Sequence, residues 1–196
     1  MHISIILAHP DENSFNHAIA NTVLETLKKL GHNTNFHDLY FEKFNPILPV
    51  DELPKDALLT DEISDHCNEI SNADGIIIIH PNWWGQPPAI LKGWVDRVLR
   101  AGVAYEFIGD DNGEGVPNGL LNAKTALVFN TSNTSTNRVK SIFDDPLELL
   151  WNNCIFDLCG INNFYRRMFN IIVTSSDLDR KKWLNEVEET VTKYFR

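Results

Sequence analysis

The stretch GIIIIHPNWWGQPPAILKGWVDRVLRA (75–101) combines the strongest strand pattern of the chain with a clear helical pattern. Its four consecutive isoleucines, residues 76–79, are β-branched and unbroken by polar side chains, which predicts a strand buried on both faces. After a loop rich in proline and tryptophan, residues 88–101 place apolar side chains in pairs at the spacing of a helical stripe. A buried strand followed by a helix is the building unit of parallel sheets.

The same alternation extends to both ends of the chain. We expect further strands at 3–8, 33–39, 123–130 and 163–173, and further helices at 15–30, 61–72, 146–159 and 177–194. Because parallel neighbours need a crossover between them, this pattern predicts a parallel sheet with helices on both faces. We find no repeat or linker and expect residues 1–196 to form a single α/β domain.

Two stretches do not fit the alternation. Residues 40–60 are rich in proline and acids, and residues 106–119 are rich in glycine and aspartate. Both are expected to be surface excursions that either cover an active site or contact a partner subunit.

Charge and cysteine usage limit the class of protein. The net charge of −10 without a basic stripe argues against nucleic acid as a partner. The three cysteines Cys67, Cys154 and Cys159 show no CxxC spacing, and the last two fall on the apolar stripe of one expected helix, so we expect buried, reduced thiols. With neither a signal peptide nor a membrane-spanning run in the sequence, we expect a cytoplasmic protein without membrane insertion. The seven histidines form no ligand spacing with cysteine, so no metal is expected.

Three loops are expected to carry the chemistry. The carboxyl ends of parallel strands lie on one edge of a sheet, and ligands bind there at the point where the strand order reverses. The relevant loops are 8–16, 80–88 and 130–135, and all three are rich in hydrogen-bonding side chains, prolines or aromatics.

The first loop ends at a helix start. Ser14 is an expected N-cap, and the amides of Phe15 and Asn16 would then point outward as a phosphate site. An ordinary capped helix with His9 on the surface is the alternative. In the second loop, one of the adjacent indoles of Trp83 and Trp84 is expected to pack inward while the other faces a planar ligand, unless both are core or interface anchors.

The third loop offers amides and hydroxyls that can stabilise an anionic ring edge, although polar turns have the same composition. The sequence has no GxGxxG, GxxxxGK[ST], HExxH or GxSxG motif. These absences argue against Rossmann dinucleotide, P-loop, zincin and α/β-hydrolase sites.

Four segments give the chain a resemblance to a known family. They are LAHPDENSFNHAIA (7–20), FNPI (44–47), PNWWGQPPAILKGWVDRVLRAGVAYEF (81–107) and the LW…CGI pattern within 150–161. With these segments the chain resembles the flavodoxin-like NAD(P)H:quinone oxidoreductases, a family that includes quinone reductases, drug-activity modulators and ancillary subunits of potassium-efflux systems. The resemblance covers nearly the whole chain and implies a three-layer α/β/α fold with a five-stranded parallel sheet of order 2-1-3-4-5.

The resemblance also implies a cofactor and its contacts. The cofactor would be FAD or, alternatively, FMN, with NAD(P)H as co-substrate, a quinone or similar acceptor, and a homodimer that shares the active site. The implied cofactor contacts are His9, Ser14, Phe15, Asn16, Pro81, Asn82, Trp83, Trp84, Gly85, Thr131, Ser132, Asn133 and Thr134. The implied substrate contacts at the dimer interface are Val103, Ala104 and Tyr105.

The chain departs from the family pattern in its third loop. The Tyr and His that buffer charge at the reduced flavin in the mammalian members align with Asn137 and Phe143, which relay no proton. Asn133 and Thr134 replace paired glycines. No protein side chain is therefore assigned as catalytic, and these changes put turnover with quinones in doubt.

The implied reaction is ping-pong. NAD(P)H passes a hydride to flavin N5 and leaves, and a quinone then takes two electrons at the same place. Three alternatives stay open: a flavin-binding regulatory subunit of a potassium-efflux transporter, a one-electron carrier, and a flavin-free interaction protein. The sequence leaves open FAD or FMN, NADH or NADPH, and the physiological acceptor.

Overall fold

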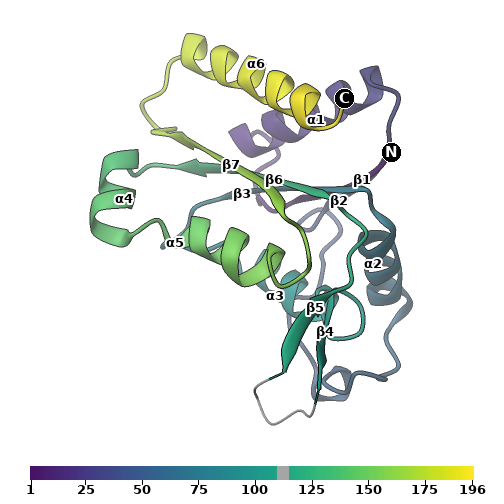
Figure 1. The fold of residues 1–196 in the computed structure, drawn as a ribbon. Helices are drawn as coiled ribbons and strands as arrows, with labels where there is room; N and C mark the ends of the chain where they lie inside the picture. Colours follow the sequence, from purple (N-terminus) through teal and green to yellow (C-terminus); the bar gives the residue numbers. More distant parts are fainter. Residues whose placement is uncertain (110–114) are drawn as a thin grey trace.

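A computed structural model describes residues 1–109 and 115–196 (Figure 1). Its main sheet has five strands in the order β2-β1-β3-β6-β7, and every neighbouring pair is parallel. The strands are β1 (His2–Leu7), β2 (Asn33–Asp38), β3 (Gly75–Pro81), β6 (Thr125–Ser132) and β7 (Asn163–Asn170). Since β6 and β7 are the fourth and fifth strands of this sheet along the chain, the expected order 2-1-3-4-5 is confirmed.

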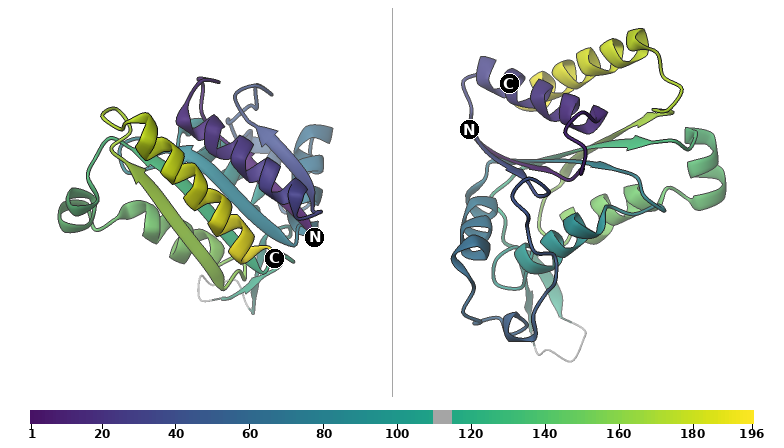
Figure 2. Two further views of the ribbon diagram at one scale, coloured as in Figure 1. Left: turned by 90° about the horizontal axis from the view of Figure 1, so that it is seen from above. Right: turned by 180° about the vertical axis from the view of Figure 1, so that it is seen from behind.

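Helices cover both faces of the sheet (Figures 1 and 2). Helices α1 (Phe15–Lys29) and α6 (Asp177–Tyr194) pack side by side on one face. The opposite face carries α2 (Asp61–Asn72), α3 (Ala89–Val98) and a helix formed by α5 (Pro146–Glu148) and η2 (Leu149–Phe156). The layers and the flavodoxin-like architecture are as expected.

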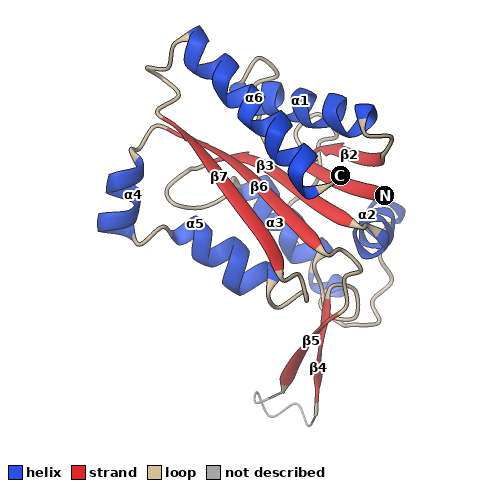
Figure 3. Cartoon of the chain, turned by 45° about the horizontal axis from the view of Figure 1, so that its top comes forward, coloured by secondary structure: helices blue, strands red, loops and turns tan. Residues whose placement is uncertain are grey.

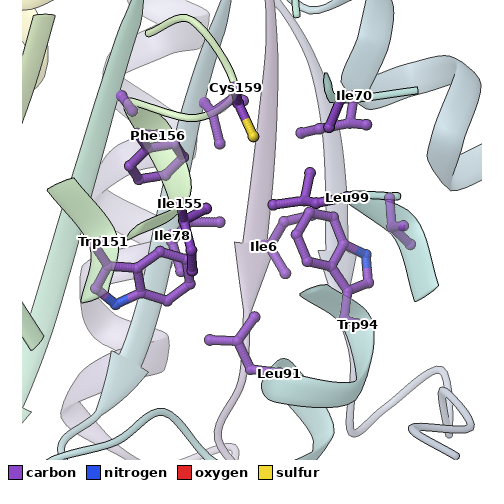
Figure 4. Packing of buried hydrophobic residues seen from close by; sticks show 14 of the residues in the cluster. Ile6, Ile70, Ile78, Leu91, Trp94, Leu99, Trp151, Ile155, Phe156 and Cys159 are labelled. Carbon is purple, nitrogen blue, oxygen red and sulfur yellow. The ribbon is translucent and has the colours of Figure 1, made fainter. Parts of the chain in front are cut away.

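The isoleucines of β3 divide between the two cores. Ile77 and Ile79 belong to the core under α1 and α6, whereas Ile76 and Ile78 belong to the core under α2, α3 and η2. This division follows from the two-residue period of a strand and explains why a continuous apolar run is needed here. Figure 4 shows Ile78 in the second core, with Leu91 and Trp94 of α3 and Trp151 of η2.

Two elements were not expected. The segment after the third loop forms α4 (Thr136–Phe143), and the 106–119 excursion contributes to an antiparallel hairpin of β4 (Tyr105–Ile108) and β5 (Val116–Gly119), which projects away from the main sheet (Figure 3). Residues 110–114 of that excursion lie outside the described part of the chain.

The 40–60 excursion is fastened to α3. It contains the short 3₁₀-helix η1 (Val50–Glu52), and the buried carboxylate of Glu52 accepts two hydrogen bonds from Arg97, at 2.9 and 2.6 Å. Arg97 also donates to the carbonyl of Asn45 at 2.7 Å. The sequence indicated a surface excursion, and the structure adds the ion pair that holds it in place.

The helix expected at 146–159 has an unusual winding. Its middle is π-helical, with hydrogen bonds that span five residues, such as the one from the Asp157 amide to the Asn152 carbonyl at 2.9 Å. This wider winding turns Cys154 out of the apolar stripe. The prediction that Cys154 is buried is therefore wrong: it is exposed, while Cys67 and Cys159 are buried. Among the described residues, no helix combines the length and apolarity needed to cross a membrane.

Candidate functional site

A cleft of about 420 Å³ lies where the loops after β1, β3 and β6 meet. The register of the sheet brings these strand ends together, because β3 lies between the other two and pairs Ile79 with Leu7 and Pro81 with Thr131. The cleft is lined by His9, Asp11, Asn13, Ser14, Phe15, Asn16, Pro81, Asn82, Trp83, Thr131, Ser132, Asn133, Thr134, Ile172 and Arg180. Most of the side chains expected to touch a cofactor therefore share one cleft.

The start of α1 forms one end of the cleft. Ser14 caps the helix by accepting a hydrogen bond from the amide of His17, as expected. Among the described residues the amides of Phe15 and Asn16 have no acceptor, as is usual for the first turn of a helix. Such amides, together with the positive end of the helix dipole, suit a phosphate group.

Asn16 is buried in the wall of the cleft, and only one of the two polar atoms of its side chain has a hydrogen-bond partner among the described residues. Its Nδ2 donates to the Thr131 hydroxyl at 2.9 Å, but its Oδ1 has no partner among the described residues. A buried acceptor without a partner is costly, so this atom calls for a donor. The Asn16 Oδ1 and the amides of Phe15 and Asn16 are thus polar groups at this end of the cleft that lack a partner among the described residues.

His9 is neutral at neutral pH. Partial burial, the largest effect, lowers its pKa, although the nearby Asp11 carbonyl opposes the change. Its Nδ1 lies 3.1 Å from the Asp11 amide nitrogen and 3.2 Å from the Asp11 carbonyl oxygen, so it either accepts from the first or donates to the second, depending on the tautomer. The ring lies beside Trp83, with 6.3 Å between ring centroids. His9 thus brings a polar ring with a lowered pKa to the lining of the cleft.

The third loop leaves one backbone donor free. The Thr134 amide is already bonded to the Ser132 hydroxyl at 3.1 Å, and the Asn133 side chain accepts the Val173 amide at 3.0 Å. In the described part of the chain the Asn133 amide has no acceptor. Of the backbone amides of Asn133 and Thr134, which we expected to act as donors, only the Asn133 N–H is therefore free among the described residues.

The second loop, 80–88, which we call the tryptophan loop, differs from the expectation. Trp83 and Gln86 exchange two backbone hydrogen bonds of 3.0 Å, and the Gly85 amide donates to Asn82 Oδ1 at 2.9 Å. The tight turn puts Trp84 at a φ of 58°, which points its indole into solvent. The prediction that one indole packs inward is wrong, because Trp83 is 42% and Trp84 101% exposed.

A second hollow of about 500 Å³ adjoins the cleft. The two share Asn82 and Thr134. The hollow is lined by Asn82, Trp84, Gly85, Thr134, Arg138, Val139, Phe143 and Pro146. Trp84 and Gly85, both expected at the cofactor, thus line the neighbouring hollow rather than the cleft. Phe143 lines it as well, whereas Asn137 lines neither space.

Comparisons with known proteins show the family of the chain. A family model described as a flavodoxin-like fold matches residues 1–191. An uncharacterized NAD(P)H oxidoreductase of Haemophilus influenzae is 38% identical over 181 residues, which cover 90% of this chain and 87% of the relative. The chain belongs to the flavodoxin-like NAD(P)H:quinone oxidoreductase family.

Other members of the family are more distant. NAD(P)H dehydrogenase [quinone] 1 of Rattus norvegicus is 32% identical over 80% of this chain, and the match spans 64% of the rat protein. The crystal structure of Smu.1420 from Streptococcus mutans superposes with a TM-score of 0.84 at 31% identity and covers 97% of this chain and 98% of that one. Both the resemblance seen in the sequence and the enzyme class it implied, an oxidoreductase, are confirmed.

The residues expected at a substrate lie apart from the cleft. Val103 and Ala104 precede β4, Tyr105 begins it, and none of the three lines the cleft or the hollow. Ala104 is fully buried, while Tyr105 is half-buried. Within one chain these three residues do not lie with the other site residues. Their role in substrate binding stays a prediction, and it requires a second copy of the chain.

Four cleft residues were missed in the sequence. Asp11 and Asn13 belong to the first loop, which was singled out, but their polar side chains resemble ordinary turn residues. Ile172 and Arg180 follow β7, whose loop was not considered. Arg180 donates to the Ser175 hydroxyl at 3.0 Å and to the Ile172 carbonyl at 3.3 Å, which holds its guanidinium at the cleft. The signal in the sequence that could have indicated Arg180 is its position in the first turn of the helix that follows the last strand.

A cluster of metal-ligand groups lies away from the cleft. His37, Glu42 and His66 offer ligand atoms within 4.8 Å of one another, although they come from β2, the loop after it and α2. Burial alone lowers the pKa of His37, but hydrogen bonds to Glu42 and Glu69 outweigh it and raise the pKa. Burial lowers the pKa of His66 to about 4. Both nitrogens of His37 are thus engaged by carboxylates, as a charged imidazolium would be.

Proposed function

We propose that the cleft binds a flavin and that the protein uses it to transfer two electrons from NAD(P)H to a quinone or a similar acceptor. The observation that carries this proposal is the convergence, in one cleft, of free helix amides, a buried acceptor without a partner and a free loop amide. These groups match a phosphate, a hydroxylated chain and the edge of a heterocycle, which are the three parts of a flavin nucleotide.

Each part of the flavin has a partner in the cleft. The amides of Phe15 and Asn16, with the ring of His9 beside them in the lining, would hold the phosphate. The Oδ1 of Asn16 would accept a hydrogen bond from a ribityl hydroxyl. The free amide of Asn133 would donate to the pyrimidine edge of the ring, where a fixed donor favours developing negative charge.

The chemistry divides between cofactor and protein. When bound, the flavin supplies two-electron chemistry, so that NAD(P)H, a proton and a quinone yield NAD(P)⁺ and a hydroquinone in a ping-pong sequence. The protein orients the ring and keeps a face open to the adjoining hollow, whose Trp84 and Phe143 provide aromatic walls. We favour FAD over FMN because of the family resemblance of the first loop.

We propose that the active unit is a homodimer. The 40–60 excursion exposes Phe41, Ile47, Val50, Leu53 and Leu58, and the hairpin exposes Phe107, Ile108 and Val116. Lys55 and Glu106 approach to 3.7 Å, and the ribbon places the hairpin at one end of the molecule (Figure 1). We call these eight exposed apolar residues the hairpin patch and propose that they form one interface. An exposed apolar area of this kind favours a protein partner.

Steady-state kinetics tests the proposed function. The protein, reconstituted with FAD or FMN, should oxidise NADH or NADPH in the presence of a naphthoquinone, with parallel lines in double-reciprocal plots. Convergent lines would contradict the ping-pong order. The absence of NAD(P)H oxidation with both flavins and several quinones would contradict the function itself.

A further inference from the structure

We propose that Arg138 makes the hollow between Trp84 and Phe143 selective for anionic aromatic acceptors, meaning flat rings that bear a carboxylate or a sulfonate. The inference rests on the proposed function and names a substrate class for the same site.

The residues that line the hollow suit a flat ring. Its apolar lining comes from Trp84, Val139, Phe143 and Pro146, and the indole of Trp84 is fully exposed. Aromatic walls favour planar ligands through dispersion and stacking. The cleft and the hollow meet at Asn82 and Thr134, so a ring in the hollow lies next to the cofactor proposed for the cleft.

Arg138 is the cation in the lining. Its guanidinium lies 5.4 Å from the centroid of the Phe143 ring, and it forms no ion pair with a described carboxylate. By contrast, Arg97, Arg166 and Arg167 each bind a carboxylate. Arg100, Arg180 and Arg196 likewise form no ion pair among the described residues, so Arg138 is distinguished by its place in the lining of the hollow.

The surroundings of Arg138 also favour an anion. No acidic side chain is among the residues that line the hollow. Arg138 lies in the first turn of α4, whose N-cap Ser135 accepts its amide at 3.4 Å, so the positive end of the helix dipole adds to the guanidinium charge. A planar guanidinium stacked on a ring can still pair with a carboxylate or sulfonate through its edge.

Binding of a matched pair of probes tests selectivity without turnover. Naphthalene-2-sulfonate and naphthalene-2-sulfonamide share a ring system and differ in charge. The wild-type protein should bind the sulfonate about fivefold more tightly, measured by quenching of tryptophan fluorescence, as expected for one partly exposed charge pair. Arg138→Gln should abolish the difference, and Arg138→Lys should keep at least half of it.

Lys140→Gln is the matched control, because it removes one positive charge from the same helix and Lys140 does not line the hollow. This variant should keep the wild-type preference. Equal binding of the two probes by the wild type, or a preference that survives in Arg138→Gln, would overturn the inference.

Turnover measurements distinguish a failure of this inference from a failure of the proposed function. A 1,4-naphthoquinone with a sulfonate should show a higher kcat/KM than one with a sulfonamide at the same ring position, and only Arg138→Gln should remove the difference. If Arg138→Gln changes only the KM for NAD(P)H, the inference fails. Turnover of both quinones without a charge preference would sink the inference and leave the proposed function standing, whereas no turnover of either would contradict the proposed function.

Discussion

At the scale of single residues, Asn16 ties two of the three loops together. Its Nδ2 donates to the Thr131 hydroxyl at 2.9 Å, its Oδ1 has no partner among the described residues, and the proposed function assigns that oxygen to the flavin. We predict that Asn16→Leu raises the dissociation constant for flavin about tenfold, because it removes one ligand hydrogen bond from a buried site. Fluorescence titration measures this, with thermal melting as a check on folding.

Thr131→Val is the matched control for this prediction. It deletes the same internal hydrogen bond but leaves the Oδ1 of Asn16 in place, so it should weaken flavin binding less than Asn16→Leu. Equal effects of the two variants would show that the internal bond, rather than the free acceptor, matters for the cofactor.

His80 offers a pH test of the buried network beneath the tryptophan loop. Burial lowers its pKa to about 3, and its Nε2 accepts hydrogen bonds from Trp151 at 2.9 Å and Asn130 at 2.8 Å. Because the folded-state pKa lies below the unfolded value of about 6.5, the unfolded chain binds more protons between those values. The contribution of His80 to stability is therefore complete above pH 6.5 and declines as the pH falls toward 3.

We predict that His80→Gln flattens this dependence. Between pH 7 and 5.5 the free energy of unfolding of the wild type should fall by about 1 kcal/mol more than that of the variant, measured by urea unfolding. Parallel pH curves for the two proteins would mean that His80 is not the buried neutral group described.

At the scale of elements, Gly93 of α3 permits the close packing of the 40–60 excursion. A Cβ at this position would lie 2.2 Å from the Pro46 carbonyl oxygen. Although alanine has the higher helix propensity, we predict that Gly93→Ala lowers the free energy of unfolding by about 2 kcal/mol because the backbone must move apart. Lys92→Ala on the exposed side should change it by less than about 0.5 kcal/mol, and a stabilised Gly93→Ala protein would contradict this packing.

The elements differ in how far the sequence predicts them. The run 76–79 and the stripe of α3 each bury many apolar side chains, so periodicity located them. In contrast, α4 is eight residues long and its apolar stripe of Val139, Ile142 and Phe143 is short, so periodicity indicates it only weakly, and it buries only Val139. The π-winding of η2 is invisible to a pattern based on 3.6 residues per turn, which is why Cys154 was placed wrongly.

The residues of the candidate site also fall into those that the sequence predicts and those that it does not. Loops that follow buried strands were found because topology alone brings their residues to one edge, as for His9 and Thr131. The direction of Trp84 depends on a positive φ, and the arrival of Arg180 depends on how α6 starts. Neither leaves a signal in hydrophobic periodicity.

At the scale of the whole molecule, the hairpin patch predicts the oligomeric state. Sedimentation equilibrium at micromolar concentration should show a dimer, and Ile47→Asp combined with Val50→Asp should shift it to monomer because the added charges oppose burial. Leu178→Asp alters a side chain that is 77% exposed on α6, outside the patch, and should remain a dimer. A monomeric wild type would contradict the proposed interface.

The account as a whole depends on three separated loops forming one flavin site. The most direct measurement is a crystal structure of the protein after reconstitution with FAD or FMN. We predict one flavin per chain in the cleft, with its phosphate at the amides of Phe15 and Asn16 and its ring edge at the Asn133 amide. A protein that stays colourless after reconstitution, or a flavin bound outside this cleft, would contradict the account.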